Sequence, residues 1–297
     1  MIFKSLILKR DWQKLLNIVS IKWGNKFTSA HINLLYRSIK ANLPIDHNFV
    51  CFTDNPSNID AEIDVRPLWD DFSNIKGNYR KLKLYSKEIL SNLDYNVIFL
   101  DIDTIVVNDL SNFANLNENA LWKSPSIGGN SFVYNTSFVR IFGDEFCSIW
   151  DKFKKNPNQL IANANSEGWT GTDQAIVSHL YGGQTKTLSK RNGIISFRDD
   201  FVLQDKIELP RTAKIVSFYH NSKYGDMSDL DILERYPWVD THWMSYANDL
   251  DNTILSKFRI KREYNGKKSN RKKHIEYIKK NKKLRNEMIR NAKRYLL

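Results

Sequence analysis

The chain has 297 residues, of which 41% are hydrophobic and 12% aromatic. This composition is typical of a folded globular protein and excludes a disordered one. The formal net charge of +12 is uneven, because residues 251–297 hold 17 Lys and Arg against 4 Asp and Glu, whereas residues 1–250 hold 28 against 29. We therefore expect a folded domain over residues 1–250 and a basic helical tail over residues 251–297. A nucleic-acid enzyme would spread basic charge over its body, so nucleic acid is not an expected partner.

Membrane and redox signals are weak in this sequence. No apolar run approaches the roughly 20 residues that a membrane-spanning helix needs. The apolar stretch close to Met1 lies between lysines and is too short for the hydrophobic region of a signal peptide. The sequence has two cysteines, Cys51 and Cys147, so no disulfide framework is expected. These features predict a cytoplasmic protein. The basic tail is either a solvated, partly disordered segment or an amphipathic helix in peripheral contact with an anionic membrane.

Strands and helices alternate along the N-terminal third of the chain. β-Branched and apolar runs predict strands, and apolar residues spaced three and four apart predict helices. The expected strands are Leu16–Lys22, Asn48–Thr53, Glu62–Val65 and Tyr95–Leu100, and the helices between them are Thr28–Leu43 and Tyr79–Leu93. This alternation is typical of βαβ units, so we expect an α/β fold with a mostly parallel central sheet flanked by helices.

The later elements alternate less regularly. A short strand is expected at Ser131–Tyr134, helices at Phe138–Phe153 and Asp173–Tyr181, and strands at Ile194–Phe197 and Ala213–Tyr219. Beyond about residue 250 the pattern becomes that of a basic helix, in agreement with a separate tail.

Ligands of parallel sheets bind beyond the carboxyl ends of the strands. Trp23 and Asp54 follow two predicted strands in this way. Trp23 is a candidate to stack on a nucleobase, although tryptophan is more often a core residue. Lys22, Lys26 and Lys81 are candidates to bring ammonium groups to a pyrophosphate, or else are ordinary surface lysines.

A pair of carboxylates follows the apolar strand that ends at Leu100. Asp101 and Asp103 lie two residues apart, so their side chains can point to the same side of the chain. Two close carboxylates repel each other unless a cation neutralises them, and oxygen ligands suit Mg²⁺ or Mn²⁺. Such a cation can bridge a diphosphate and stabilise the charge of a departing nucleotide. The alternative is a strand that ends in two solvated aspartates.

The segment KLKLYSKEILSNLDYNVIFLDIDTIVV, residues 81–107, resembles the donor site of GT-A glycosyltransferases of the glycogenin-like and lipopolysaccharide galactosyltransferase group. In that group a helix with a Lys-Leu-x-x-aromatic pattern precedes an apolar strand that ends in Asp-x-Asp. The segments IKWGNKFTSAHINLLYRSIKANL and FVCFTDN also resemble bacterial glycosyltransferases. The resemblance extends from about residue 16 to 245. It implies a metal-dependent enzyme that moves a hexose from a nucleotide-sugar, most simply a UDP-sugar, to a glycan, lipid or protein acceptor.

Further residues are assigned by this resemblance alone. Asn130, in Gly-Gly-Asn-Ser-Phe-Val, is similar to the segment that lines the sugar pocket, and Asp173 with Gln174 matches the catalytic Asp-Gln element. Asp173 also fits an ordinary helix cap. His220 matches a third metal ligand, and Lys223 matches a diphosphate ligand. The chain departs from the family after His220, because the expected His-x-x-Gly-x-x-Lys-Pro-Trp is absent.

Two other functions remain open from the sequence. FLDIDTIVV approximates the nucleophile motif of haloacid dehalogenase-like phosphatases, with Asp101 as the nucleophile and Asp199-Asp200 as the late acidic pair. Ile105 stands where that family has Thr or Val, and several strands precede the motif, which both argue against this alternative. The second alternative is a non-enzymatic protein that binds polyanions through its basic tail.

Overall fold

The structure is a computed structural model that describes residues 14–125, 133–169, 171–219, 227 and 229–264. Its centre is a seven-stranded sheet with the strand order β3-β2-β1-β4-β7-β6-β8. The strands are β1 (Leu16–Lys22), β2 (His47–Thr53), β3 (Asp64–Pro67), β4 (Asn96–Leu100), β6 (Ala120–Lys123), β7 (Tyr134–Phe142) and β8 (Lys186–Leu188). β1 to β4 run parallel, whereas β7 is antiparallel to both β4 and β6. The predicted α/β fold with a mostly parallel central sheet is confirmed.

A second, three-stranded sheet has the order β5-β10-β9. It is built from β5 (Thr104–Val106), β9 (Ile194–Ser196) and β10 (Ile215–Ser217). β10 runs antiparallel to β5 and parallel to β9. Because only three residues separate β4 from β5, the chain passes from one sheet to the other through Asp101-Ile102-Asp103.

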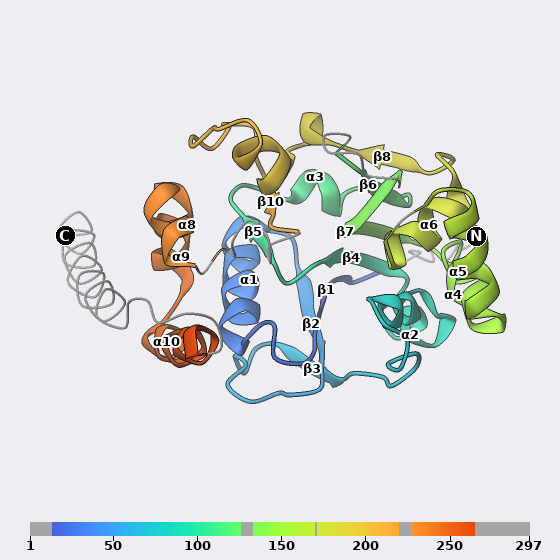
Figure 1. The fold of residues 1–297 in the computed structure, drawn as a ribbon, viewed down its shortest axis with the longest axis horizontal. Coiled ribbons are helices and arrows are strands. Elements are labelled where there is room, and N and C mark those ends of the chain that lie inside the picture. Colours follow the sequence, from blue (N-terminus) through green and yellow to red (C-terminus); the bar gives the residue numbers. More distant parts are fainter. Residues whose placement is uncertain (1–13, 126–132, 170, 220–226, 228, 265–297) are drawn as a thin grey trace, which may run out of the picture.

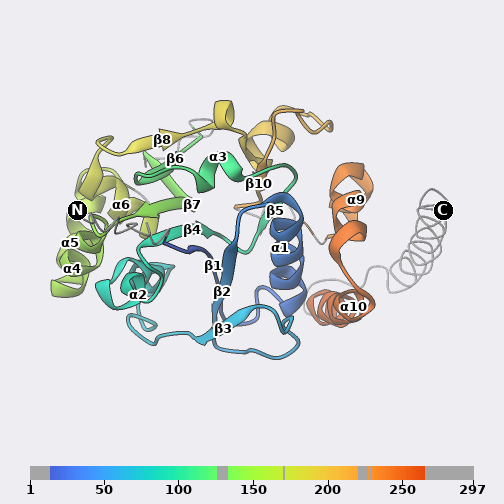
Figure 2. The ribbon, with the colours of Figure 1, turned by 180° about the vertical axis from the view of Figure 1, so that it is seen from behind.

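Helices cover both faces of the central sheet (Figure 1). They are α1 (Ser29–Asn42), α2 (Lys87–Ser91), α3 (Ser111–Ala114), α4 (Cys147–Lys155), α5 (Pro157–Ser166), α6 (Asp173–Tyr181), α8 (Leu230–Arg235), α9 (Pro237–Tyr246) and α10 (Asp249–Tyr264), with the short turns η1 (Tyr79–Tyr85), η2 (Lys190–Asn192) and η3 (Arg198–Val202). Helices α4 to α6 lie on one side, α1 on the other, and α8 to α10 outside α1 (Figure 1 and Figure 2). In the described part of the chain, no helix combines the length and apolarity needed to cross a bilayer.

The central strand β1 shows why the strands of the sheet could be predicted from the sequence. Val19 and Ile21 pack in the core on the side of α4 to α6, whereas Ile18 packs in the core on the side of α1. All seven residues of β1 are buried. A strand buried on both faces is rich in apolar and β-branched residues instead of alternating with polar ones, and the predicted and observed bounds of β1 agree.

Two predicted helices are wrong in part. The chain over 79–93 is divided at Ser86, whose extended backbone ends η1 and whose hydroxyl accepts a hydrogen bond from the N–H of Ile89 at 3.2 Å. The predicted helix over Phe138–Phe153 begins only at Cys147, since residues up to Phe142 belong to β7. Pairing with β4 and β6 on both sides extends these residues into a strand.

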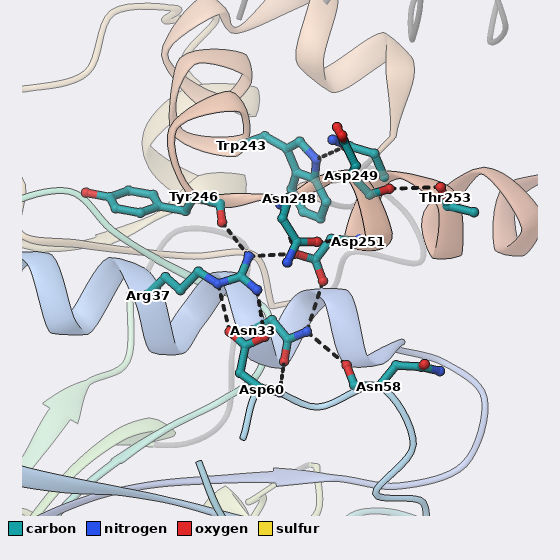
Figure 3. Close-up of polar contacts among 11 residues, drawn as sticks. Asn33, Arg37, Asn58, Asp60, Trp243, Tyr246, Asn248, Asp249, Asp251 and Thr253 are labelled. Atoms are coloured by element: carbon teal, nitrogen blue, oxygen red, sulfur yellow. Dashed lines mark hydrogen bonds and ion pairs between the residues drawn. The ribbon is translucent and has the colours of Figure 1, made fainter. Parts of the chain in front are cut away.

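Helix α10 packs against α1 through hydrogen bonds and an ion pair to a buried carboxylate (Figure 3). Asp251 is fully buried, and its carboxylate accepts hydrogen bonds from Arg37 at 2.6 Å and Asn33 at 2.9 Å. Arg37 also forms a two-point ion pair with Asp60. The predicted tail boundary at residue 250 therefore falls within α10, whose first turns pack on the domain. Most of the predicted basic tail lies outside the described residues, so its independence stays a prediction.

Candidate active site

A polar cavity of about 350 Å³ opens at the carboxyl ends of β1 and β4. This is the edge where parallel sheets bind their ligands. The loop after β1, the turn after β4, the start of β7 and the start of α6 all contribute to its wall. The lining residues are Ile21, Trp23, Lys26, Phe27, Asn78, Lys81, Asp101, Ile102, Asp103, Asn135, Thr136, Ser137, Gln174 and Tyr219.

The two predicted metal ligands, Asp101 and Asp103, both line this cavity. The backbone N–H of Asp101 donates to the carbonyl of Ser137 in β7 at 3.0 Å. The carbonyl of Asp103 accepts from the N–H of Phe218, beside β10, at 2.8 Å. Ile102 points into the core between them. The motif is thus held by both sheets, which fixes its two carboxylates at one wall of the cavity.

A buried lysine joins Asp101 to Asp173. The ammonium group of Lys81 lies 2.8 Å from a carboxylate oxygen of Asp101 and 3.0 Å from one of Asp173. Burial disfavours the charged form of Lys81, but the two carboxylates outweigh it and raise the pKa of Lys81 above its ordinary value. The site therefore holds a fixed positive charge next to Asp101.

Asp173 lies behind Lys81, with only 1% of its surface exposed. Its carboxylate accepts hydrogen bonds from the hydroxyl groups of Thr136 and Thr172. Burial alone would raise the pKa of Asp173, yet Lys81 and the two hydroxyl groups lower it below its ordinary value. Asp173 is thus an ionised structural partner of Lys81 and does not line the cavity, whereas its neighbour Gln174 does.

The other predicted residues divide into three groups. Trp23 and Lys26 line the cavity, and their binding of a nucleotide-sugar stays a prediction. Lys22 and Asp54 do not: Lys22 is buried at the end of β1, and the Asp54 carboxylate accepts from the N–H of Gly24 at 2.8 Å, which braces the loop after β1. The remaining predicted residues, Asn130, His220 and Lys223, lie outside the described residues.

The carboxylate pair fits a hard divalent cation, because Asp101 and Asp103 bring oxygen ligands to a polar cavity. Within the described ranges, which omit residues 220–226, no group of three His, Cys, Asp or Glu side chains is placed to hold a metal ion. The predicted third ligand, His220, falls in that gap. Any metal at this site would have Asp101 and Asp103 as its ligands from the described chain.

Several residues that line the cavity were not predicted from the sequence. Asn135, Thr136 and Ser137 open β7 and line the cavity, whereas the prediction named the segment around Asn130. A signal for them existed, because three consecutive polar residues directly precede the apolar Phe138-Val139. Asn78 and Tyr219 also line the cavity and had no recognisable signal.

Tyr219 connects the cavity to a buried polar cluster of Ser196, Arg198 and Asp199. Its hydroxyl donates to the carboxylate of Asp199 and accepts from Arg198 at 3.0 Å. Asp199 also accepts from Arg198 at 2.7 Å and from Ser196. Burial and the adjacent Asp199 raise the pKa of the Tyr219 phenol, so it remains protonated and can donate.

This cluster disfavours the phosphatase alternative. In that alternative, Asp199 and Asp200 could serve as the late acidic pair beside Asp101. The carboxylate of Asp199 instead accepts hydrogen bonds from Arg198 and Tyr219. The carboxylate of Asp200 forms an ion pair with Lys190 at 2.5 Å. Neither Asp199 nor Asp200 lines the cavity that holds Asp101.

Comparison with solved structures identifies the architecture. No protein-family model and no curated protein sequence matches the chain. The chain is similar to the galactosyltransferase LgtC in complex with donor and acceptor sugar analogs, with a TM-score of 0.58 and 16% identity over 78% of this chain and 97% of that one. The chain has the GT-A glycosyltransferase fold.

Two larger glycosyltransferases share this fold. GlyE of Streptococcus pneumoniae matches with a TM-score of 0.52 and 16% identity, over 84% of this chain and 64% of that one. The bifunctional glycosyltransferase WbbM matches with a TM-score of 0.53 and 12% identity, over 82% of this chain and 51% of that one. The GT-A architecture thus accounts for most of this chain and for only part of GlyE and WbbM.

Proposed function

We propose that this protein is a metal-dependent glycosyltransferase that moves a hexose from a nucleotide-sugar, most simply a UDP-hexose, to a glycan acceptor. One observation carries the proposal: Asp101 and Asp103 lie together on the wall of a polar cavity at the ligand-binding edge of a GT-A fold. LgtC, which has this fold, was crystallised with donor and acceptor sugar analogs.

The reaction exchanges one bond at the anomeric carbon of the hexose for another. The bond to the diphosphate breaks, a bond to an acceptor hydroxyl oxygen forms, and the hydroxyl proton is released. A divalent cation bound by Asp101 and Asp103 would neutralise charge on the departing diphosphate. The described side chains bind and orient both substrates around that bond.

Individual roles follow from position. Lys26 lines the cavity, and its ammonium group would pair with a phosphate oxygen. Gln174 offers an amide for hydroxyl groups of the hexose. Lys81 holds Asp101 at 2.8 Å, and Asp173 holds Lys81 at 3.0 Å. Asp173 is therefore a positioning residue that acts through Lys81, and not the group that touches the sugar.

The first prediction concerns the metal. Excess chelator is expected to abolish slow hydrolysis of a UDP-hexose while leaving the circular dichroism spectrum unchanged, since the core around Asp101 is built from apolar strands. Adding back Mn²⁺ or Mg²⁺ is expected to restore hydrolysis. Hydrolysis that persists in excess chelator would remove the metal from the mechanism but not the transferase.

The second prediction concerns Trp23, which is half-buried at the cavity wall, with the guanidinium carbon of Arg80 5.9 Å from its ring centroid. Stacking of a base on an aromatic ring is worth about 1–3 kcal/mol. Trp23→Ala is therefore expected to raise the KM for the donor about fivefold or more with a small change in kcat, measured by steady-state hydrolysis. Trp23→Phe keeps an aromatic face and is the matched control. Equal KM values for the two variants would show that Trp23 does not stack on the base.

A further inference from the structure

A second hollow, of about 550 Å³, is lined by residues of α3, β8 and the segments that lead into β9 and β10. It is at the far end of the small sheet from the candidate active site. Strand β10 begins next to Lys214, which lines the hollow, and leads toward Tyr219, which lines the active-site cavity. Lys214 and Tyr219 are five residues apart along an extended segment, which at about 3.3 Å per residue corresponds to about 16 Å. The hollow and the active-site cavity are therefore distinct sites.

The hollow is rich in positive charge. Lys186, Arg191, Arg211 and Lys214 line it, and none of the described residues in its wall is acidic. Lys186 pairs with Glu118 nearby, and the ammonium group of Lys214 donates to the carbonyl of Asp109 at 2.5 Å. The guanidinium groups of the exposed residues Arg191 and Arg211 have no hydrogen bond or ion pair with any described residue. Two forked donors are therefore free for a ligand.

Two amides add further donors. The side-chain oxygen of Asn108 accepts from the N–H of Asp109 at 2.8 Å, and that of Asn192 accepts from the N–H of Ser189 at 3.0 Å. Because a backbone N–H can only donate, these contacts fix which amide atom is the oxygen. The amide nitrogens of Asn108 and Asn192 remain as donors at the hollow, and Asn112 and Thr212 line it beside them.

Because the side chains that line the hollow offer hydrogen-bond donors, they favour a ligand with many acceptor oxygens. We propose that this hollow binds a phosphate-bearing saccharide, with Arg191 and Arg211 on the phosphate oxygens and the amides of Asn108 and Asn192 on sugar hydroxyls. Nucleic acid is a poorer fit, because the one aromatic residue in the wall, Phe113, is only 2% exposed and offers no face for base stacking among the described residues. The proposal concerns a separate site and does not depend on the proposed function.

Binding of glucose 6-phosphate to the full chain, measured by calorimetry at low ionic strength, tests the proposal. The wild type is expected to bind glucose 6-phosphate more tightly than either glucose or inorganic phosphate. The double variant Arg191→Ala/Arg211→Ala is expected to weaken this binding about tenfold or more, because it removes two charged hydrogen-bonding groups. Both side chains are exposed, so the fold and the hydrolysis of a UDP-hexose are expected to be unchanged.

The matched control is Lys152→Ala/Lys155→Ala, which removes two positive charges from the exposed face of α4. If this control weakened glucose 6-phosphate binding as much as the arginine variant, general charge and not the hollow would be responsible, and the proposal would be overturned. Inorganic phosphate that bound as tightly as glucose 6-phosphate would overturn the assignment of a saccharide. Tighter binding of a short single-stranded RNA that competes with glucose 6-phosphate would overturn it as well.

Discussion

Asp251→Ala is expected to lower the free energy of unfolding by about 3 kcal/mol. The carboxylate of Asp251 accepts from Arg37 at 2.6 Å, from Asn33 at 2.9 Å and from the backbone N–H of Asn248 at 3.0 Å. All three contacts are lost in the variant, and the buried amide of Asn33 and the half-buried guanidinium of Arg37 each lose an acceptor. The loss falls at the low end of the range for broken buried ion pairs, because Arg37 keeps its contact with Asp60. Urea denaturation measures the change.

Glu62→Ala is the matched control, since it also removes a carboxylate paired with a basic residue of α1. Glu62 lies 3.6 Å from Lys40, and the two side chains are 63% and 60% exposed. Exposed pairs of this kind contribute little, so a change of at most about 0.5 kcal/mol is expected. Similar losses for Asp251→Ala and Glu62→Ala would contradict the view that α10 is an integral part of the domain.

The position of Asp251 also bears on how the chain divides. Charge counting predicted a boundary at residue 250, because basic residues concentrate after it. Asp251 and Leu255 are nevertheless buried, so the first half of α10 belongs to the folded domain. Charge composition reports which segments are solvated on average, and it cannot locate the residue at which a helix stops packing.

The fold was most predictable where every residue of an element is buried, as in β1. It was least predictable where the sequence pattern of a strand also fits a helix. Arg140 illustrates the second case. It interrupts the apolar run of β7, so Phe138–Phe142 resembles the start of a helix with a polar face. In the structure Arg140 is buried, with its guanidinium donating to the carbonyl groups of Leu116, Val97 and Ile141, and burial lowers its pKa to about 10. Two of these carbonyl groups, those of Leu116 and Val97, lie far from Arg140 in the sequence, so the burial of this arginine leaves no periodic signal.

Only those site residues that lie close together in the sequence could be predicted as a group. Asp101 and Asp103 follow an apolar strand, and this pattern is visible within a few residues. The contact of Lys81 with Asp173 joins residues far apart in the sequence, and it arises because η1 and α6 meet above β4 and β7. Both Asp173 and Gln174 were predicted, and the fold places Asp173 behind Lys81 while Gln174 lines the cavity. Residue types alone cannot distinguish these two neighbours.

Asp103→Asn is expected to lower kcat for hydrolysis of a UDP-hexose by at least about a hundredfold, equivalent to roughly 2.7 kcal/mol of activation free energy. Asparagine keeps the shape and one acceptor oxygen but removes a charge from the cavity wall, where Asp103 is 8% exposed. A hard cation is then bound more weakly and neutralises less of the charge that grows on the diphosphate. Because this charge is largest in the transition state, kcat falls more than donor affinity.

The variant must be shown to fold, because Asp103 sits between the two sheets. An unchanged thermal midpoint for Asp103→Asn, together with a higher Mn²⁺ concentration for half-maximal hydrolysis, separates loss of the cation from loss of structure. Asp151→Asn, at an exposed position of α4, removes the same charge away from the cavity and is expected to leave kcat unaltered. If folded Asp103→Asn turned over like Asp151→Asn with the same Mn²⁺ dependence, the carboxylate pair would be a structural turn and the proposed metal site would be wrong.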